Sequence, residues 1–364
     1  MSMTIAERLR PYSHTPGTYS LLPGSFYRFQ IFPCLIRVHD LTQADPILVT
    51  EIHLALPGLM RDFTIQVDLE KGRIIVWGHT SIGFFRYHLI SDANGRGWSL
   101  YAEKVPSIGL EIIADNNTWK LQSKESALFG VQTFTPYLPP VQDRLSLGNH
   151  KAQDWDLVCR RLDLKEIFPM WNRLAQLIPA LPPPSSIEGT LTLLADCQQV
   201  LLDNQSEQIV PSFEKAFKAS FQGILSPRLW DDDYQGLLPI RAIQNQHLSP
   251  LSLMAEGQQL IRHLFIEQQE NEITLLPHLP PEFHCGRFLR VAVKGGVLDL
   301  EWSKKVIRRL IFYASEDQEI TWHFKKNIKY YRLRHSYQTK GMQLQAGDSS
   351  LFKKNCYYFL DNFI

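Results

Sequence analysis

The segment from 273 to 314 constrains the fold most, because its prolines and glycines fix where strands end and turn. A short apolar strand at 273–276 must stop at Pro277, since proline donates no backbone hydrogen bond to a ladder. The Gly-Gly pair at 295–296 then allows a turn with positive φ. The sequence VLDLEW, residues 297–302, follows with apolar and polar side chains in strict alternation. We therefore expect a half-buried antiparallel hairpin.

Two further strands extend this hairpin. The sequence IRRLIFYA from Ile307 completes a meander, and EITWHF from Glu319 supplies a fourth strand. Together these signals predict a small antiparallel β-sandwich over residues 271–364.

The first part of the chain shows the same strand period over a longer stretch. From about residue 19 to 140, short alternating segments rich in aromatic and β-branched residues are separated by turn sequences such as Glu-Lys-Gly and Asn-Gly-Arg-Gly. This spacing is typical of an antiparallel sandwich. We expect a large antiparallel β-sandwich over residues 15–145.

Between residues 146 and 270 the apolar period becomes helical. A stretch with helical spacing is interrupted at Pro169, and three more amphipathic segments follow at 190–204, 213–225 and 251–266. Four or five helices therefore form a short middle region. The expected fold class is multidomain α+β, with this helical region as a bridge between the two β-domains.

The C-terminal signals resemble a known family. Their order is similar to the C-terminal β-domain of the inverting alpha-L-fucosidases of glycoside hydrolase family ninety-five and of related enzymes built on an (α/α) toroid. The preceding segment, EGQQLIRHLFIEQQ from Glu256, resembles the last helix of that toroid. The residues that carry the resemblance are Leu275, Leu276, Pro277, Leu279, Pro280, Gly286, Gly295, Gly296, Asp299, Glu301 and Trp302.

The resemblance implies an accessory domain and not a catalytic centre. A toroid of six helical hairpins needs about a dozen helices, more than the middle region holds at average helix length. An inverting glycosidase also needs two carboxyl groups about 6.5–9.5 Å apart, and no toroid motif is present to supply them. We expect a glycoside-hydrolase-like protein that is not catalytic and has a carbohydrate-binding or protein-interaction role. The alternative is a divergent inverting glycoside hydrolase that uses carboxylates near Asp231–Asp233.

One candidate binding site is an acidic run between two aromatic residues. Aromatic rings can stack on the C–H face of a sugar while carboxylates accept hydrogen bonds from its hydroxyls. A solvated acidic loop explains the same residues, because Asp favours turns and helix caps. No EF-hand spacing accompanies the run, so we expect no metal site. The residues are Trp230, Asp231, Asp232, Asp233 and Tyr234.

A second candidate lies where the strand period changes to the helical one, since junctions between domains often form clefts. It consists of His150, Asp154 and Trp155. The simpler interpretation is that Asp154 caps a helix and Trp155 fills the interface. Glu256 is a further candidate on the last helix, although a surface glutamate explains it equally well. His263, on the same apolar helix, is expected to be a packed core histidine.

Composition excludes several classes of function. Lys and Arg number 38 against 37 Asp and Glu, so charge favours neither nucleic acid nor an anionic membrane. No apolar run approaches the roughly 20 residues that span a bilayer, and the first residues lack the apolar core of a secretory signal. We expect a cytoplasmic protein with five reduced cysteines and no cofactor, because nucleotide-binding and metal motifs are missing. A carbohydrate, a protein partner or a second copy of the chain remain open as partners.

Overall fold

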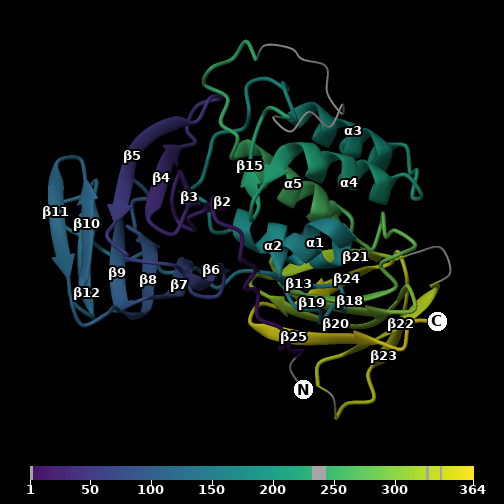
Figure 1. Ribbon diagram of the computed structural model, residues 1–364. Coiled ribbons are helices and arrows are strands. Elements are labelled where there is room, and N and C mark those ends of the chain that lie inside the picture. The colour runs from purple at the N-terminus through teal and green to yellow at the C-terminus, as the bar shows by residue number, and fades with distance from the viewer. Residues whose placement is uncertain (1–2, 232–242, 325–327, 337) are drawn as a thin grey trace.

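The computed structural model describes residues 3–231, 243–324, 328–336 and 338–364. Two β-rich regions flank a short helical middle, which is the expected multidomain α+β fold (Figure 1). The N-terminal sandwich lies to the left in this view, the helices at the upper right and the C-terminal sheets at the lower right.

The N-terminal region is a sandwich of two antiparallel six-stranded sheets. Its inner faces carry large apolar side chains such as Phe29, Phe85 and Tyr87, none of which is exposed. The first sheet runs β1 (Tyr12–Ser13), β6 (Arg61–Asp68), β7 (Arg73–Thr80), β8 (Gly83–Ser91), β9 (Trp98–Lys104) and β12 (Glu125–Phe129). The second runs β11 (Asn117–Leu121), β10 (Leu110–Ala114), β5 (Ile47–Leu54), β4 (Leu35–Asp40), β3 (Tyr27–Ile31) and β2 (Thr18–Leu21).

The C-terminal region contains a seven-stranded and a four-stranded sheet that pack face to face. The ring of Phe312, from the larger sheet, lies 5.6 Å from that of Trp322 and 5.4 Å from that of Phe352, both from the smaller sheet. The larger sheet runs β13 (Arg144–Ser146), β18 (Cys285–Val293), β19 (Gly296–Ser303), β20 (Val306–Ala314), β25 (Cys356–Asp361), β22 (Tyr330–Arg334) and β23 (Met342–Gln345). The smaller runs β16 (Ile266–Gln269), β17 (Glu272–Leu275), β21 (Gln318–His323) and β24 (Ser349–Phe352).

The predicted hairpin is confirmed as β18 and β19, and β20 completes the meander. Along β19 every second side chain is buried, with Leu298, Leu300 and Trp302 at most 1% exposed. The expected fourth strand forms as β21, but it does not extend this sheet. It pairs in parallel with β17 instead, because the chain crosses to the smaller sheet after β20.

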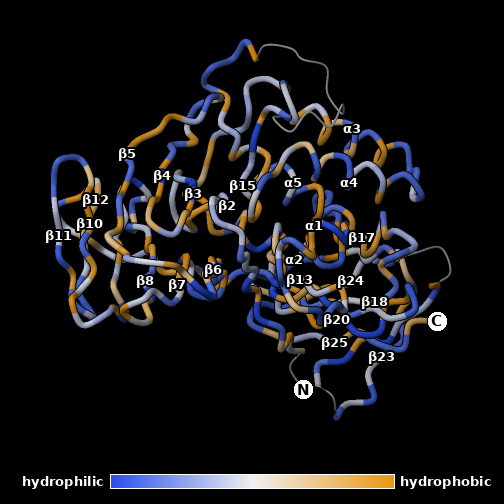
Figure 2. The backbone as a smooth tube through the Cα atoms, viewed as in Figure 1, coloured by the Kyte–Doolittle hydropathy of each residue, from blue (hydrophilic) through white to orange (hydrophobic). Residues whose placement is uncertain are grey.

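Five helices form the middle region within the described residues, and Figure 2 shows that hydrophobic and hydrophilic residues alternate along both helices and strands. The expected break at Pro169 is wrong, since this proline lies inside a helix. The break comes instead at Leu162, which has a left-handed backbone (φ 51°), and Asp163 caps the helix that follows. The helices are α1 (Trp155–Arg161), α2 (Leu164–Ala175), α3 (Leu191–Leu202), α4 (Ile209–Ser220) and α5 (Ser252–His263), and a small hairpin of β14 (Phe221–Gln222) and β15 (Ser226–Pro227) follows α4.

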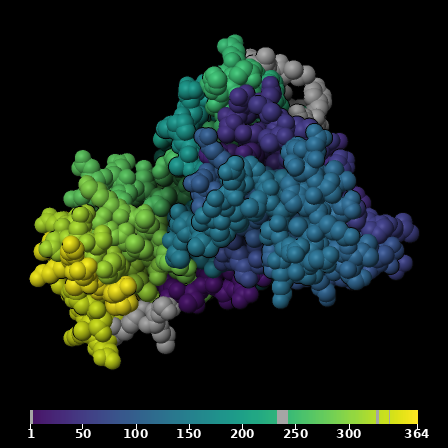
Figure 3. Space-filling model, turned by 90° about the vertical axis from the view of Figure 1, so that its left-hand side faces the viewer, coloured from purple at the N-terminus to yellow at the C-terminus, as the bar shows by residue number. Residues whose placement is uncertain are grey.

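The first described residues tie the two β-regions together. Met3 packs with Leu289 and Ile311 on the outer face of the larger C-terminal sheet. The chain then continues into the sandwich, where the carbonyl oxygen of Leu9 accepts a hydrogen bond from the amide of Leu69. In Figure 3 the purple N-terminal residues lie between the two β-regions at the base of the molecule. We call residues 3–11 the N-terminal strap.

Within the described residues, every helix is too short or too polar to cross a bilayer.

Candidate functional site

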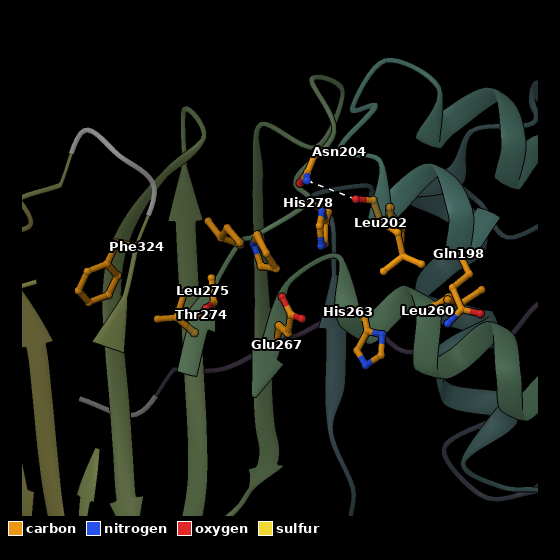
Figure 4. Close-up of a pocket in the computed structure, with 13 residues that line it drawn as sticks. Gln198, Leu202, Asn204, Leu260, His263, Glu267, Thr274, Leu275, His278 and Phe324 are labelled. Carbon is orange, nitrogen blue, oxygen red and sulfur yellow. Dashed lines mark hydrogen bonds between the residues drawn. The ribbon is translucent and has the colours of Figure 1, made fainter. Parts of the chain in front are cut away.

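A groove of about 590 Å³ lies where the helices meet the smaller C-terminal sheet (Figure 4). The ends of α3 and α5 form one side, and the β16–β17 hairpin with the loop after it forms the other. We call it the junction groove. Its described lining residues are Gln198, Leu201, Leu202, Asn204, Leu260, His263, Glu267, Thr274, Leu275, Leu276, Pro277, His278 and Phe324.

The strand period places the polar groups of the hairpin on one face. Glu267 and Thr274 are direct neighbours across the antiparallel pair of β16 and β17, so their side chains point to the same side. Ile266 and Leu275 point into the core at 2% and 0% exposure. The groove is therefore the outer face of a hairpin whose inner face is fixed by packing.

The loop after β17 turns sharply toward the groove. Leu276 has a left-handed backbone (φ 56°), and its amide donates to the carbonyl oxygen of Phe265 at 2.7 Å. Pro277 follows and cannot continue the strand ladder. This turn brings His278 beside Leu202 and Asn204 at the end of α3, as Figure 4 shows.

Two imidazoles and one carboxylate meet in the groove. Burial lowers the pKa of His278, the nearby Glu267 carboxylate opposes this shift, and His263 adds to it. The His278 ring is therefore neutral around pH 7, with one ring nitrogen able to donate and the other able to accept a hydrogen bond. A neutral imidazole beside a carboxylate suits recognition of hydroxyl or amine groups.

The expectation that His263 is a core histidine is wrong. It is exposed at the end of α5, while Leu260, Ile261 and Leu264 form the buried stripe of that helix. His263 follows Leu260 by three positions on the helix, so both side chains border the groove.

The chemistry of the groove is amphipathic. Leucine side chains and Pro277 form its apolar walls, and amides from Gln198 and Asn204 add hydrogen-bonding groups. Glu267 is the single carboxylate among the described lining residues. In the part of the chain that the structure describes, no three His, Cys, Asp or Glu side chains are grouped to hold a metal ion.

The acidic run predicted as a binding site lies elsewhere. The indole nitrogen of Trp230 donates to Asp45 at 3.3 Å, on the sandwich side of the helices. Asp231 is engaged in a 3.2 Å ion pair with Arg228. Asp232, Asp233 and Tyr234 fall outside the described residues.

The second predicted site divides into separate structural roles. Asp154 caps α1, accepting hydrogen bonds from the amides of Asp156 and Leu157, as the simpler interpretation expected. Trp155 is 2% exposed and packs against Phe217. His150 is exposed on the connecting loop.

Glu256 is half-buried on α5 and is not among the described lining residues of the groove. The side chain that faces the groove one turn later on this helix is Leu260.

Sequence reasoning missed Glu267, Thr274 and His278. The alternation around Ile266 and Leu275 could have placed Glu267 and Thr274 on the outer face of a hairpin. No local signal places Gln198 of α3 opposite them, because that contact depends on how the helices pack.

No protein-family model matches the chain, and no curated protein matches it.

Proposed function

We propose that this protein is a non-catalytic relative of the toroidal glycoside hydrolases and that it binds a carbohydrate in the junction groove. One observation supports the proposal most strongly. A single groove is lined by one carboxylate, two imidazoles and two side-chain amides, and its walls are apolar. Its volume of about 590 Å³ is in the usual range for small-molecule sites.

Sugars match this mixture of surfaces. A pyranose ring presents C–H groups on its faces and hydroxyls around its edge. Leu202 and Pro277 supply apolar surface for the faces, and Glu267 accepts hydrogen bonds from hydroxyls. The neutral ring of His278 both donates and accepts, as a hydroxyl group does.

The same groove argues against turnover. Glycoside hydrolysis uses two carboxyl groups on opposite sides of the scissile bond. The described lining offers Glu267 alone, and Asp231, the described member of the alternative set, is engaged with Arg228 inside the protein. The proposal therefore favours binding over the divergent glycosidase.

The experiment is a thermal-shift and glycan-array screen of wild type and of a Glu267→Gln, His278→Ala double variant. A matched control is Glu282→Gln, His284→Ala, since this glutamate and histidine are both exposed and lie outside the groove. We expect a stabilising glycan whose effect disappears in the groove variant and persists in the control.

Three results would overturn the proposal. Release of reducing sugar from a bound glycan at a rate that depends on Glu267 would make the protein an enzyme. Equal glycan binding by the groove variant and wild type would place the site elsewhere, and no binding to any glycan would favour a protein-interaction role.

A further inference from the structure

The described lining residues of the junction groove include a single carboxylate. Glu267 is its one acidic side chain, and the described lining residues include no lysine or arginine. Across the described residues, none of the ion pairs involves Glu267. Its carboxylate contacts the Gln269 amide at 3.4 Å, a neutral partner. Among the described residues, the Glu267 carboxylate thus has no ion-pair partner.

A described cation beside the groove, on α5, is engaged elsewhere. Arg262 precedes His263 on α5, but its guanidinium lies 3.5 Å from Asp143 and donates to the carbonyl oxygen of Ala292. The neighbouring His278 is neutral around pH 7 because burial lowers its pKa. In Figure 4 the Glu267 carboxylate points into the space between Thr274, His263 and His278. A ligand cation in that space would contact the Glu267 carboxylate beside the neutral ring of His278.

A protonated amine complements this arrangement better than a hydroxyl does. A hydrogen bond that involves a charged group is roughly twice as strong as one between neutral groups. An ammonium group donates three hydrogen bonds. The carboxylate of Glu267 can accept one of these hydrogen bonds. The hydroxyl of Thr274 and an imidazole nitrogen are further acceptors on the same side of the groove.

We propose that the ligand of the junction groove is an amino sugar, a hexosamine unit with a free amine that binds the Glu267 carboxylate. This inference rests on the proposed carbohydrate function and adds the class of sugar. The apolar walls would hold the sugar ring, and the amide groups of Gln198 and Asn204 would contact its hydroxyls.

The test is a calorimetric titration at about pH 7 with glucosamine, N-acetylglucosamine and glucose, using the wild type, Glu267→Gln and His278→Ala. Cyclohexylamine serves as an amine of similar size without hydroxyls. We expect glucosamine to bind about tenfold more tightly than the two uncharged sugars. Glu267→Gln should remove this preference while keeping the weaker binding of all three sugars. Thermal melts of each variant establish that it is folded.

The outcomes separate this inference from the proposed function. Equal binding of all three sugars that is lost in His278→Ala overturns the amino-sugar assignment and leaves the carbohydrate site standing. Binding of cyclohexylamine as tight as that of glucosamine also overturns it, because the hydroxyl contacts would then contribute nothing. No binding of any sugar to wild type overturns the proposed function itself.

Discussion

The guanidinium of Arg228 lies 3.2 Å from the carboxylate of Asp231, and the two side chains are only 3% and 6% exposed. Arg228 also donates to the carbonyl oxygens of Lys218 and Ala219 at the end of α4. The pair therefore holds the C-terminus of a helix to the chain that follows it. Removing one partner leaves the other charge buried, so we expect Asp231→Ala to lower the free energy of unfolding by about 3–5 kcal/mol.

Chemical denaturation measures this loss, with an exposed ion pair as the control. Arg37 and Glu51 approach more closely, at 2.8 Å, but their side chains are 42% and 38% exposed. Glu51→Ala should cost less than about 1 kcal/mol. Equal losses in the two variants would contradict a structural role for Asp231.

Gly257 on α5 lies directly against Trp171 of α2. A Cβ atom added at this glycine would lie 2.1 Å from Cζ2 of Trp171, whose side chain is fully buried. Alanine normally stabilises a helix by about 1 kcal/mol relative to glycine. Here we expect Gly257→Ala to destabilise by about 1–3 kcal/mol, because the ring must move in a filled core.

A double-mutant cycle with Trp171→Leu checks the cause. The smaller side chain makes room, so the cost of Gly257→Ala should shrink in that background. Gln259→Ala, on the exposed side of the same helix, should change stability by less than about 0.5 kcal/mol. A stabilising Gly257→Ala variant would show that the two helices are further apart.

Met3 anchors the N-terminal strap to the C-terminal sheet. It is 7% exposed and covers Leu289 and Ile311, so Met3→Ala should lower the free energy of unfolding by about 2 kcal/mol. Leu59, which is 86% exposed, serves as the control, and Leu59→Ala should be nearly neutral. Faster proteolysis of the Met3 variant near its start would agree, whereas unchanged stability would mean that the strap contributes nothing.

His39 makes the stability of the sandwich depend on pH. Burial, with Arg28 and Arg37 adding to it, lowers the pKa of His39 from 6.5 to about 4. Between these values the unfolded chain binds the proton and the folded protein does not, so stability is lost as pH falls from about 6.5 to 4. Solvent screening of this half-buried ring limits the loss to about 1–2 kcal/mol.

Denaturation of wild type and His39→Gln across this window measures the effect. The variant cannot take up the proton, so its stability should fall less steeply with decreasing pH. A variant with the same slope as wild type would contradict the assignment.

The fold was predictable where one face of an element is buried. The alternation from Val297 to Trp302 and the Gly-Gly turn before it are local signals, and β18 and β19 follow them. The parallel pairing of β21 with β17 was not predictable in this way, because it depends on a crossover between sheets. The strap was missed for the same reason, since Met3 acquires its role only from the distant residues Leu289 and Ile311.

The site was less predictable than the fold. The aromatic and acidic residues around Trp230 and Asp231 predicted a binding site. In the structure Trp230 donates a hydrogen bond to Asp45, and Asp231 forms an ion pair with Arg228. Glu267 and His278 are unremarkable in the sequence and meet through the turn at Leu276. Composition indicates which chemistry a chain can offer, but packing decides which groups face the same space.

Non-catalytic glycan binding in the junction groove can be tested by an NMR titration of the protein with a binding glycan, followed on the backbone amides while the sugar signals are monitored for products. We expect shifts centred on Thr274, Leu275 and His278, with the sugar unchanged over the course of the titration. Shifts centred on Trp230, or the appearance of hydrolysis products, would contradict it.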